Sequence, residues 1–151
     1  VRYFEPELDG EVCFYDRLNP CVLTVRPYPG ISPEILNRTL DCYDGLVIEC
    51  FGTSGIPAYG GFDEAVKRWA KAGKVIVATT QVPYEGSDMS VYRVGKSLMD
   101  AGILEAFDMT PEAVLAKLMW VLGRTSDREE IRQEFRKRVW MDTLQEGKDL
   151  Q

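Results

Sequence analysis

Apolar residues along this chain follow two alternating patterns. Short continuous apolar runs, which are typical of buried strands, occupy residues 22–25, 45–50, 74–78 and 103–106, the last being either a short strand or an extended segment. Apolar residues three and four positions apart, which are typical of amphipathic helices, occur within residues 32–40, 62–72, 90–101, 110–122 and 126–139. Strands that alternate with helices form a parallel sheet covered by those helices. We therefore expect an α/β fold, a three-layer sandwich in which a small, mostly parallel, Rossmann-like sheet of four strands is flanked by helices.

The predicted helices carry recognisable end signals. Ser32 and Thr110 are expected N-caps, each followed by a proline at the first helical position. Gly73 is expected to end the second helix in the left-handed conformation that glycine adopts readily. The third helix is expected to begin near residue 90 and to bury Val91. The last helix opens with a Ser-Asp-Arg-Glu capping box whose cap is Ser126.

The predicted fourth helix is apolar on nearly all sides. Between Ala113 and Leu122, its one charged residue is Lys117. A helix with this pattern is buried by the sheet and by a further surface. Lys117 is expected to extend its ammonium group to solvent or to pair with a carboxylate, and Trp120 to be a core or interface residue. Asp142 is expected to belong to a solvated tail.

Length and local composition indicate one domain preceded by a connecting segment. The 151 residues are enough for a sizeable core. Residues 20–151 are expected to form the domain, and residues 1–19 a linker or edge segment. Within that segment, residues 11–15 fit either an additional edge strand or an extended linker, and the sequence does not decide between them.

The composition excludes several classes of function. The net charge of −6 argues against a nucleic-acid partner, which requires a clustered basic surface. No apolar run has the length of a membrane span. The chain has no histidine and its four cysteines have no Cys-x-x-Cys spacing, so we expect neither a metal site nor a cofactor. The cysteines are expected to be reduced thiols of a cytoplasmic protein, with Cys50, at a strand end, as the one candidate for reactivity.

Two loops that follow predicted strands are candidate ligand sites, because open parallel sheets bind ligands at the carboxyl ends of their strands. The first loop, residues 51–61, contains four glycines, so its backbone N–H groups can approach a ligand or another subunit. The alternative is a plain surface connection. The candidate residues of this loop are Thr53, Ser54 and Gly55.

The second loop, residues 79–89, is rich in polar side chains. Its hydroxyl and amide groups, from Thr80 and Gln81, suit a small zwitterion, and the carboxylates of Glu85 and Asp88 suit the ammonium group of such a ligand. The alternative is that the polar residues cap the next helix or are solvated. A hydroxyl nucleophile needs an adjacent base, which without histidine would be a lysine. No threonine lies beside a lysine in a recognisable motif, so we expect no catalytic residue in this chain.

Several short motifs occur together in the chain. They are Tyr-Pro-Gly-Ile at residues 28–31, Thr-Gln at 80–81, Tyr-x-x-Gly at 92–95 and Asp-Met-Thr-Pro-Glu-Ala at 108–113. In this combination they resemble the C-terminal domain of type I (cytoplasmic) L-asparaginases, and the similarity extends over roughly residues 20–135. The same domain closes one subunit of the archaeal glutamyl-tRNA amidotransferase, its asparaginase-type subunit, so the chain is similar to that protein too.

The resemblance implies a part in the hydrolysis of L-asparagine to L-aspartate and ammonia by a cytoplasmic enzyme. In such enzymes the nucleophile lies in a larger N-terminal domain, which is missing from this sequence. The C-terminal domain helps to build a homodimer or larger assembly and, in some members, an effector site for asparagine. By resemblance, Thr80 is the best candidate for an effector or interface contact. Asp88 lies near a position from which related enzymes direct an acidic residue toward the partner's substrate pocket.

Two residues depart from the members that have an effector site. Those members resemble one another in having an arginine where this chain has Glu49 and an asparagine where it has Gly55. An anion in place of a cation disfavours the carboxylate of a ligand, so we do not expect control by asparagine. Two other interpretations stay open: the asparaginase-type subunit of the tRNA-dependent amidotransferase, and a free-standing module that binds a small amino acid.

Overall fold

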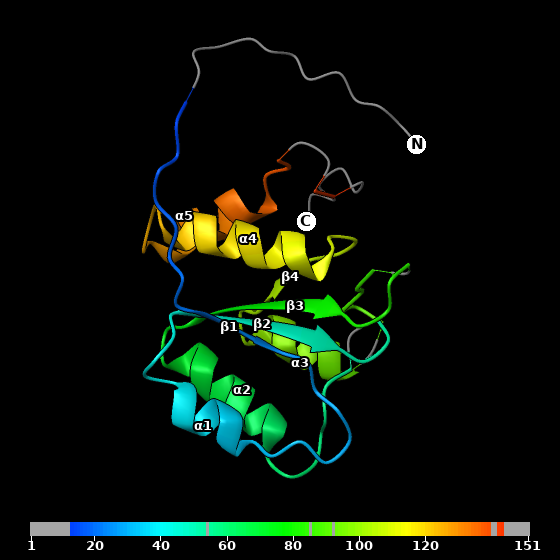
Figure 1. Cartoon of the computed structure of the whole chain (residues 1–151). Coiled ribbons are helices and arrows are strands. Elements are labelled where there is room, and N and C mark those ends of the chain that lie inside the picture. The colour runs from blue at the N-terminus through cyan, green and yellow to red at the C-terminus, as the bar shows by residue number, and fades with distance from the viewer. Residues whose placement is uncertain (1–12, 54, 85, 92, 140–141, 144–151) are drawn as a thin grey trace.

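The computed structural model describes residues 13–53, 55–84, 86–91, 93–139 and 142–143. At its centre is a parallel sheet of four strands in the order β1-β2-β3-β4 (Figure 1). The predicted parallel four-stranded sheet is thereby confirmed. Because all the strands are parallel, their carboxyl ends lie at one edge of the sheet. The strands are β1 (Val22–Val25), β2 (Gly45–Cys50), β3 (Val75–Thr80) and β4 (Leu104–Glu105).

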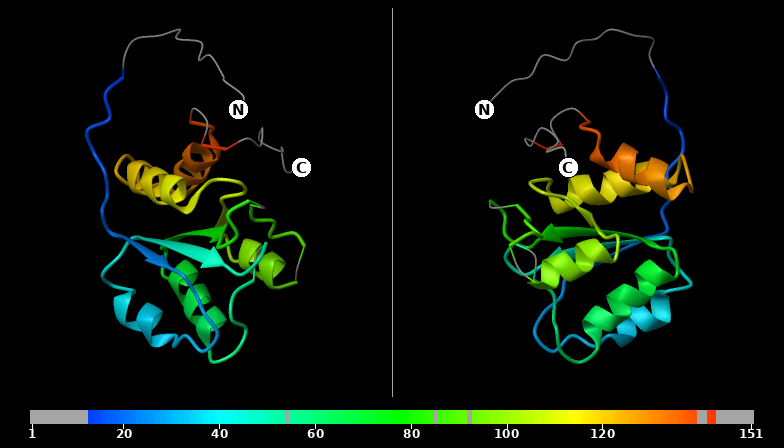
Figure 2. Two further views of the ribbon diagram at one scale, coloured as in Figure 1. Left: turned by 45° about the vertical axis from the view of Figure 1, so that its right-hand side comes forward. Right: turned by 180° about the vertical axis from the view of Figure 1, so that it is seen from behind.

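Helices cover both faces of the sheet, as predicted for a three-layer sandwich. Figures 1 and 2 show the first three helices on one face and the last two on the other. No helix in the described part of the chain is long and apolar enough to cross a membrane. The helices are α1 (Glu34–Thr39), α2 (Phe62–Lys71), α3 (Arg93–Asp100), α4 (Pro111–Leu122) and α5 (Arg128–Arg136).

The strand side chains alternate between two apolar cores, one on each face. In β3, Ala78 faces the core under α1, α2 and α3, whereas Val77 faces the core under α4 and α5. The first core contains Trp69 of α2, whose indole N–H donates a hydrogen bond of 2.9 Å to the carbonyl of Leu36. The second core contains Phe135 of α5. Burying a large apolar side chain stabilises the fold by about 1.5–3 kcal/mol. Because both faces of the sheet are buried, both sets of strand side chains are apolar, which explains the continuous apolar runs in the sequence.

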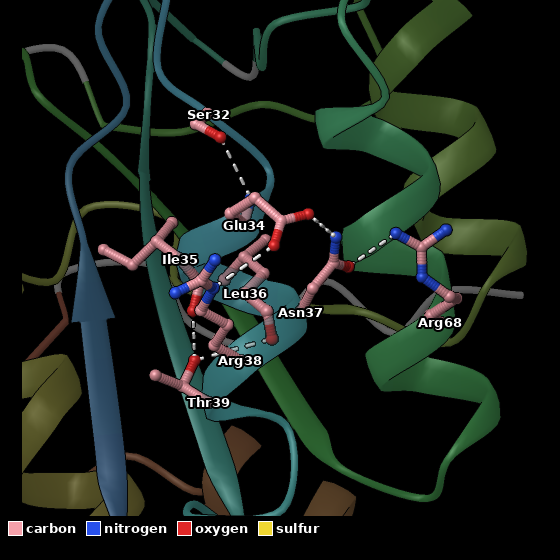
Figure 3. A network of polar contacts seen from close by, with 8 residues as sticks. All are labelled: Ser32, Glu34, Ile35, Leu36, Asn37, Arg38, Thr39 and Arg68. Carbon is pink, nitrogen blue, oxygen red and sulfur yellow. Dashed lines mark hydrogen bonds and ion pairs between the residues drawn. The ribbon is translucent and has the colours of Figure 1, made fainter.

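A network of exposed polar side chains links α1 to α2 (Figure 3). Glu34 accepts hydrogen bonds from Asn37 at 3.0 Å and from Arg38 at 3.3 Å. These two bonds lower the pKa of Glu34 below its ordinary value. Asn37 also accepts a hydrogen bond of 2.6 Å from Arg68 of α2. Ser32 was predicted as the N-cap of α1, but the N-cap is Pro33, which has no side-chain cap. The hydroxyl of Ser32 accepts the N–H of Glu34, the first residue of the helix, at 3.2 Å.

Two of the predicted helix ends, Gly73 and Thr110, are confirmed. Gly73 follows α2 in the left-handed conformation, with a φ of 90°, and the hydroxyl of Thr110 accepts a backbone N–H at the start of α4. The predicted cap of the last helix was wrong by one position. The residue that caps α5 is Asp127, whose carboxylate accepts the N–H of Glu130 at 2.8 Å, and not Ser126. A carboxylate at this position also interacts favourably with the helix dipole.

The start of α3 also differs from the prediction. The helix begins at Arg93, so Val91 precedes it and is 56% exposed instead of buried. Leu98, on the inner face of α3, is fully buried. The apolar spacing therefore identified the helix but placed its first turn too early.

The segment before β1 runs along α4 and does not join the sheet. The N–H of Asn19 donates a hydrogen bond of 2.9 Å to the carbonyl of Met119. The rings of Tyr15 and Trp120 meet edge to face, with centroids 5.2 Å apart, and the guanidinium of Arg124 lies over both rings. Of the predicted edge segment 11–15, the part that the structure describes begins at residue 13 and forms no strand.

The end of the described chain packs against α4, which corrects the prediction of a solvated tail. Lys117 is buried, and its ammonium group donates to the carboxylate of Asp142 and to the carbonyl of Lys137, both at 2.6 Å. The prediction that Lys117 pairs with a carboxylate is confirmed. The hydroxyl of the buried Thr143 donates to the carboxylate of Asp108. Single acidic and hydroxyl residues near a chain end carry no pattern that predicts such docking.

Candidate functional site

A cleft lies where the carboxyl ends of β1, β2 and β3 meet the start of α4. It encloses about 420 Å³, which is within the range of pockets that hold small molecules. The strand side supplies Arg26, Glu49 and Thr80, and the side of α4 supplies Asp108 and Glu112. The cleft is thus where an open parallel sheet is expected to bind a ligand.

An ion pair occupies the strand side of the cleft. The guanidinium of Arg26 lies 3.7 Å from the carboxylate of Glu49, and their side chains are 64% and 16% exposed. The anion that sequence analysis identified at Glu49 is therefore accompanied by a cation from the end of β1. A pair this exposed contributes at most about 1 kcal/mol to stability, so little free energy is needed to separate it.

Thr80 and Gln81, both predicted ligand contacts, line the cleft but are already engaged by the protein. The hydroxyl of Thr80 donates to the carbonyl of Gly52 and accepts the N–H of Val82 at 3.0 Å. The amide nitrogen of Gln81 donates to the carbonyls of Pro27 at 2.8 Å and Glu49 at 2.9 Å. These bonds tie together the ends of three strands, so the two side chains shape the cleft.

The other predicted contacts gather at a second place, which does not line the cleft. The backbone N–H of Asp88 donates a hydrogen bond of 2.8 Å to the carbonyl of Thr53, which joins the two candidate loops. The carboxylate of Asp88 accepts the N–H of Ser90 at 3.0 Å and its hydroxyl at 2.5 Å, a local turn contact before α3. Gly55 closes its loop through paired backbone bonds with Phe51, at 2.6 and 2.8 Å. Ser54 and Glu85, also predicted contacts, lie outside the described residues.

The Asp88 loop is also fixed by the connection between β4 and α4. The backbone N–H of Ser87 donates a hydrogen bond of 2.7 Å to the carbonyl of Phe107. Phe107 has a φ of 53°, an unusual conformation for a residue other than glycine. Gly86, with a φ of 72°, packs so closely on the backbone at Phe107 that a larger side chain would be crowded there. Such local strain persists only where the surroundings enforce it, often near functional sites.

Two titratable groups that the sequence offered for chemistry of their own, Cys50 and Lys117, are not available for it. Burial raises the pKa of the Cys50 thiol to about 12, so the candidate reactive cysteine is an unreactive core residue at neutral pH. In the described part of the chain, no cluster of three or more histidine, cysteine, aspartate or glutamate side chains is arranged to hold a metal ion. The ammonium group of Lys117 already donates hydrogen bonds to the carbonyl of Lys137 and the carboxylate of Asp142.

Three residues of this edge were missed as site candidates: Arg26, Asp108 and Glu105, the last residue of β4. Each follows or ends a strand on the carboxyl side of the parallel sheet. That position was a usable signal, because residues there converge on one edge. Arg26 and Asp108 were passed over because they lie outside the two loops richest in polar residues.

Comparison with known proteins places this geometry in context. Residues 21–135 match the glutaminase/asparaginase C-terminal domain family. The chain is 43% identical to the L-asparaginase of Thermococcus kodakarensis over 132 residues, which is 87% of this chain and 40% of that enzyme. It is 39% identical to a subunit of the glutamyl-tRNA(Gln) amidotransferase of Pyrococcus horikoshii, over 82% of this chain and 28% of that relative. The chain therefore spans less than half the length of these relatives.

Solved structures give the same result for the fold. The structure superimposes on the thermostable L-asparaginase from Thermococcus kodakarensis with a TM-score of 0.88 and 40% identity, covering 97% of this chain and 44% of that one. For L-asparaginase I from Vibrio cholerae the TM-score is 0.79 and the identity 28%, covering 89% of this chain and 41% of that one. The α/β fold predicted from the sequence is confirmed.

Proposed function

Because the chain belongs to the glutaminase/asparaginase C-terminal domain family, we propose that it is the C-terminal domain of an L-asparaginase. The complete protein would hydrolyse L-asparagine to L-aspartate and ammonia in the cytoplasm. This domain would complete the active site and the dimer interface, and the nucleophile would come from an N-terminal domain that these 151 residues do not include.

The observation that carries this proposal is the match itself. The identity of 43% extends over 87% of this chain but covers only 40% of the L-asparaginase from Thermococcus kodakarensis. The site geometry supports the same division of labour. The hydroxyl of Thr80 is engaged in backbone hydrogen bonds, and Lys117 is engaged by Asp142, so neither is arranged as a nucleophile–base pair.

Two surface features support a role in assembly. Phe14 is 89% exposed and Tyr84 is 98% exposed, and large aromatic side chains this exposed are typical of surfaces that another domain or subunit covers. Asp88 is the residue we propose to face the substrate pocket of a partner subunit in a homodimer or larger assembly. The carboxylate of Glu49 lines the cleft and argues against asparagine as an effector there, because its negative charge repels the carboxylate of such a ligand.

A chimaera tests the proposal. Residues 13–151 would be fused to the part of the Thermococcus kodakarensis L-asparaginase that this chain does not match, and ammonia release from L-asparagine would be measured in a host without asparaginases. We expect activity from the chimaera and none from the 151-residue chain. An Asp88→Asn variant should lose activity, and a Glu129→Gln variant, on the exposed side of α5, should keep it. A well-folded but inactive chimaera would contradict the proposal.

A second candidate is the C-terminal domain of the asparaginase-type subunit of a tRNA-dependent amidotransferase. It is favoured by 39% identity to the Pyrococcus horikoshii relative over 82% of this chain. Copurification of the complete protein with a partner subunit that binds tRNA would support this candidate over the first.

A free-standing module for a small amino acid is favoured only by the cleft of about 420 Å³. Calorimetry of the chain with asparagine, aspartate and glutamine tests it. Saturable binding at micromolar concentration would support it, and the absence of heat at two well-separated temperatures would count against it.

A further inference from the structure

The backbone of Met89, the residue after Asp88, is held from two sides. Its N–H donates a hydrogen bond of 2.7 Å to the carboxylate of Glu105, at the end of β4. On its other side, the backbone of Met89 lies so close to Gly95 of α3 that a Cβ at this glycine would overlap it. The side chain of Met89 is fully buried. The chain therefore has a fixed course on the C-terminal side of Asp88.

The other flank of Asp88 is fixed as well. Its own N–H donates to the carbonyl of Thr53 at 2.8 Å, and the N–H of Ser87 donates to the carbonyl of Phe107 at 2.7 Å. Three consecutive backbone N–H groups thus bind two segments that are distant in sequence: the loop after β2, and the end of β4 with the residues after it. Among the acceptors, Glu105 supplies the one side-chain carboxylate, and a hydrogen bond to an ionised acceptor is roughly twice as strong as a neutral one.

The carboxylate of Glu105 occupies an unfavourable environment. Burial raises its pKa above the ordinary value, and the nearby charge of Asp88 raises it further, although the bond from Met89 acts in the opposite direction. A glutamine here would keep an acceptor oxygen for Met89 without a buried charge. A carboxylate whose pKa is perturbed by burial and by a nearby charge, at the carboxyl ends of the strands, is typical of functional positions.

We infer that Glu105 is the positioning residue of Asp88. Its carboxylate anchors the N–H of Met89 and so fixes the backbone between Asp88 and Ser90, whose N–H and hydroxyl hold one oxygen of the Asp88 carboxylate. In this way the carboxylate keeps a fixed direction toward the substrate's ammonium group. The inference rests on the proposed function of Asp88 and assigns Glu105 no contact with substrate. Loss of the anchor should weaken substrate binding more than it slows the chemical step, because an ammonium contact is made equally before and in the transition state.

The anchoring itself is tested in the 151-residue chain by amide hydrogen exchange. Glu105→Ala removes the acceptor, Glu105→Gln keeps it, and Glu129→Ala is the control for loss of one exposed glutamate. We expect the Met89 amide to exchange at least about tenfold faster in the alanine variant and nearly at the original rate in the other two. Unchanged exchange in Glu105→Ala would overturn the inference.

A second measurement serves if the alanine variant does not fold. In the unsubstituted chain, the amide proton shift of Met89 should titrate with Glu105, at a pH above the ordinary value of a glutamate. In Glu105→Gln that titration should vanish. A Met89 shift that titrates identically in both proteins would overturn the inference.

The functional consequence is tested in the active chimaera. Glu105→Ala should raise KM for L-asparagine about tenfold with a much smaller change in kcat, and Glu105→Gln should restore most of the loss. A purely structural role would instead lower the apparent kcat at unchanged KM, and that result would overturn the positioning role. If the unsubstituted chimaera is inactive, the proposed function fails, whereas the exchange rates still decide whether Glu105 anchors Met89.

Discussion

Two glutamates of this protein have pKa values shifted in opposite directions, and the reason separates two regions of the fold. Glu34, on the exposed surface of α1, has its pKa lowered by hydrogen bonds from Asn37 and Arg38 on its own helix. Glu105, at the carboxyl edge of the sheet, has its pKa raised by burial. The first charge is held by neighbours three and four positions away, which is ordinary helix-surface chemistry. The charged form of Glu105 is instead disfavoured by its burial.

The difference between the surroundings of Glu34 and Glu105 indicates which region is constrained by function. The network around Glu34 lies among side chains that water can replace. The network around Glu105 joins segments distant in sequence, since its bond to Met89 spans 16 positions and the bond from Asp88 reaches the loop after β2. Removal of the Glu105 carboxylate would leave the partly buried backbone N–H of Met89 without its acceptor. We expect substitutions in the second region to have the larger effects.

The largest effect is expected for the buried ion pair between Lys117 and Asp142. Lys117→Ala leaves the carboxylate of Asp142, with a side chain only 12% exposed, without its cation. We expect a loss of about 3 kcal/mol in the free energy of unfolding, measured by urea denaturation. Combining Lys117→Met with Asp142→Leu should restore most of that loss, because no buried charge is then unpaired. Equal losses in the single and double variants would show that packing, and not charge, is responsible.

A smaller effect is expected for Gly95→Ala at the carboxyl edge. The new Cβ would overlap the backbone of Met89, and such overpacking costs about 2 kcal/mol, even though alanine favours a helix over glycine. Denaturation together with faster exchange of the Met89 amide would confirm it. Gly123 is not a suitable control, because a Cβ there would also crowd the backbone, at Arg17. A Gly95→Ala protein as stable as the original would mean that α3 moves freely.

The two glutamates themselves give the next prediction. Because the folded-state pKa of Glu105 is raised, its ionisation lowers stability as pH rises from the unfolded value, near 4.5, through the folded value. Glu105→Gln should therefore be more stable than the original protein at pH 7, and this difference should vanish below pH 4.5. Denaturation midpoints at both pH values measure it. A glutamine variant less stable at neutral pH would show that the carboxylate is favourable where it is.

The smallest effect is expected for Glu34→Gln. The lowered pKa of Glu34 contributes stability that is present above the unfolded pKa and is lost as pH falls through the folded value. Because Glu34 and its partner Arg38 are exposed, with side chains 57% and 81% accessible, water screens this contribution. The denaturation midpoint at pH 7 should be unchanged within error. A clear loss of stability would erase the distinction between the two regions.

The sequence predicted the parts of the fold that rest on local pattern. Continuous apolar runs identified the strands, and the glycine at residue 73 and the threonine at residue 110 marked two helix ends, because these signals act within a few residues. The environment of Asp142 was predicted wrongly. Asp142 lies 25 positions from Lys117, and nothing in the local sequence of a short polar tail distinguishes a buried partner from a solvated charge.

The candidate site was predicted only in its location. The carboxyl edge of the sheet follows from parallel topology, and Thr80 and Gln81 line a cleft there; that they contact a ligand or another subunit stays a prediction. Their engagement with backbone carbonyls was not predictable, since it depends on the relative height of three strand ends. Glu105 was missed because its proposed role rests on the hydrogen bond from Met89, a residue 16 positions earlier in the sequence and separated from it by all of α3.

Ammonia release by the chimaera tests the central claim most directly. It would join residues 13–151 to the remaining part of the Thermococcus kodakarensis L-asparaginase. The account predicts hydrolysis of L-asparagine by the chimaera, its loss in the Asp88→Asn variant, and no hydrolysis by the 151-residue chain. Ammonia released by that chain alone, or a folded chimaera without activity, would contradict it.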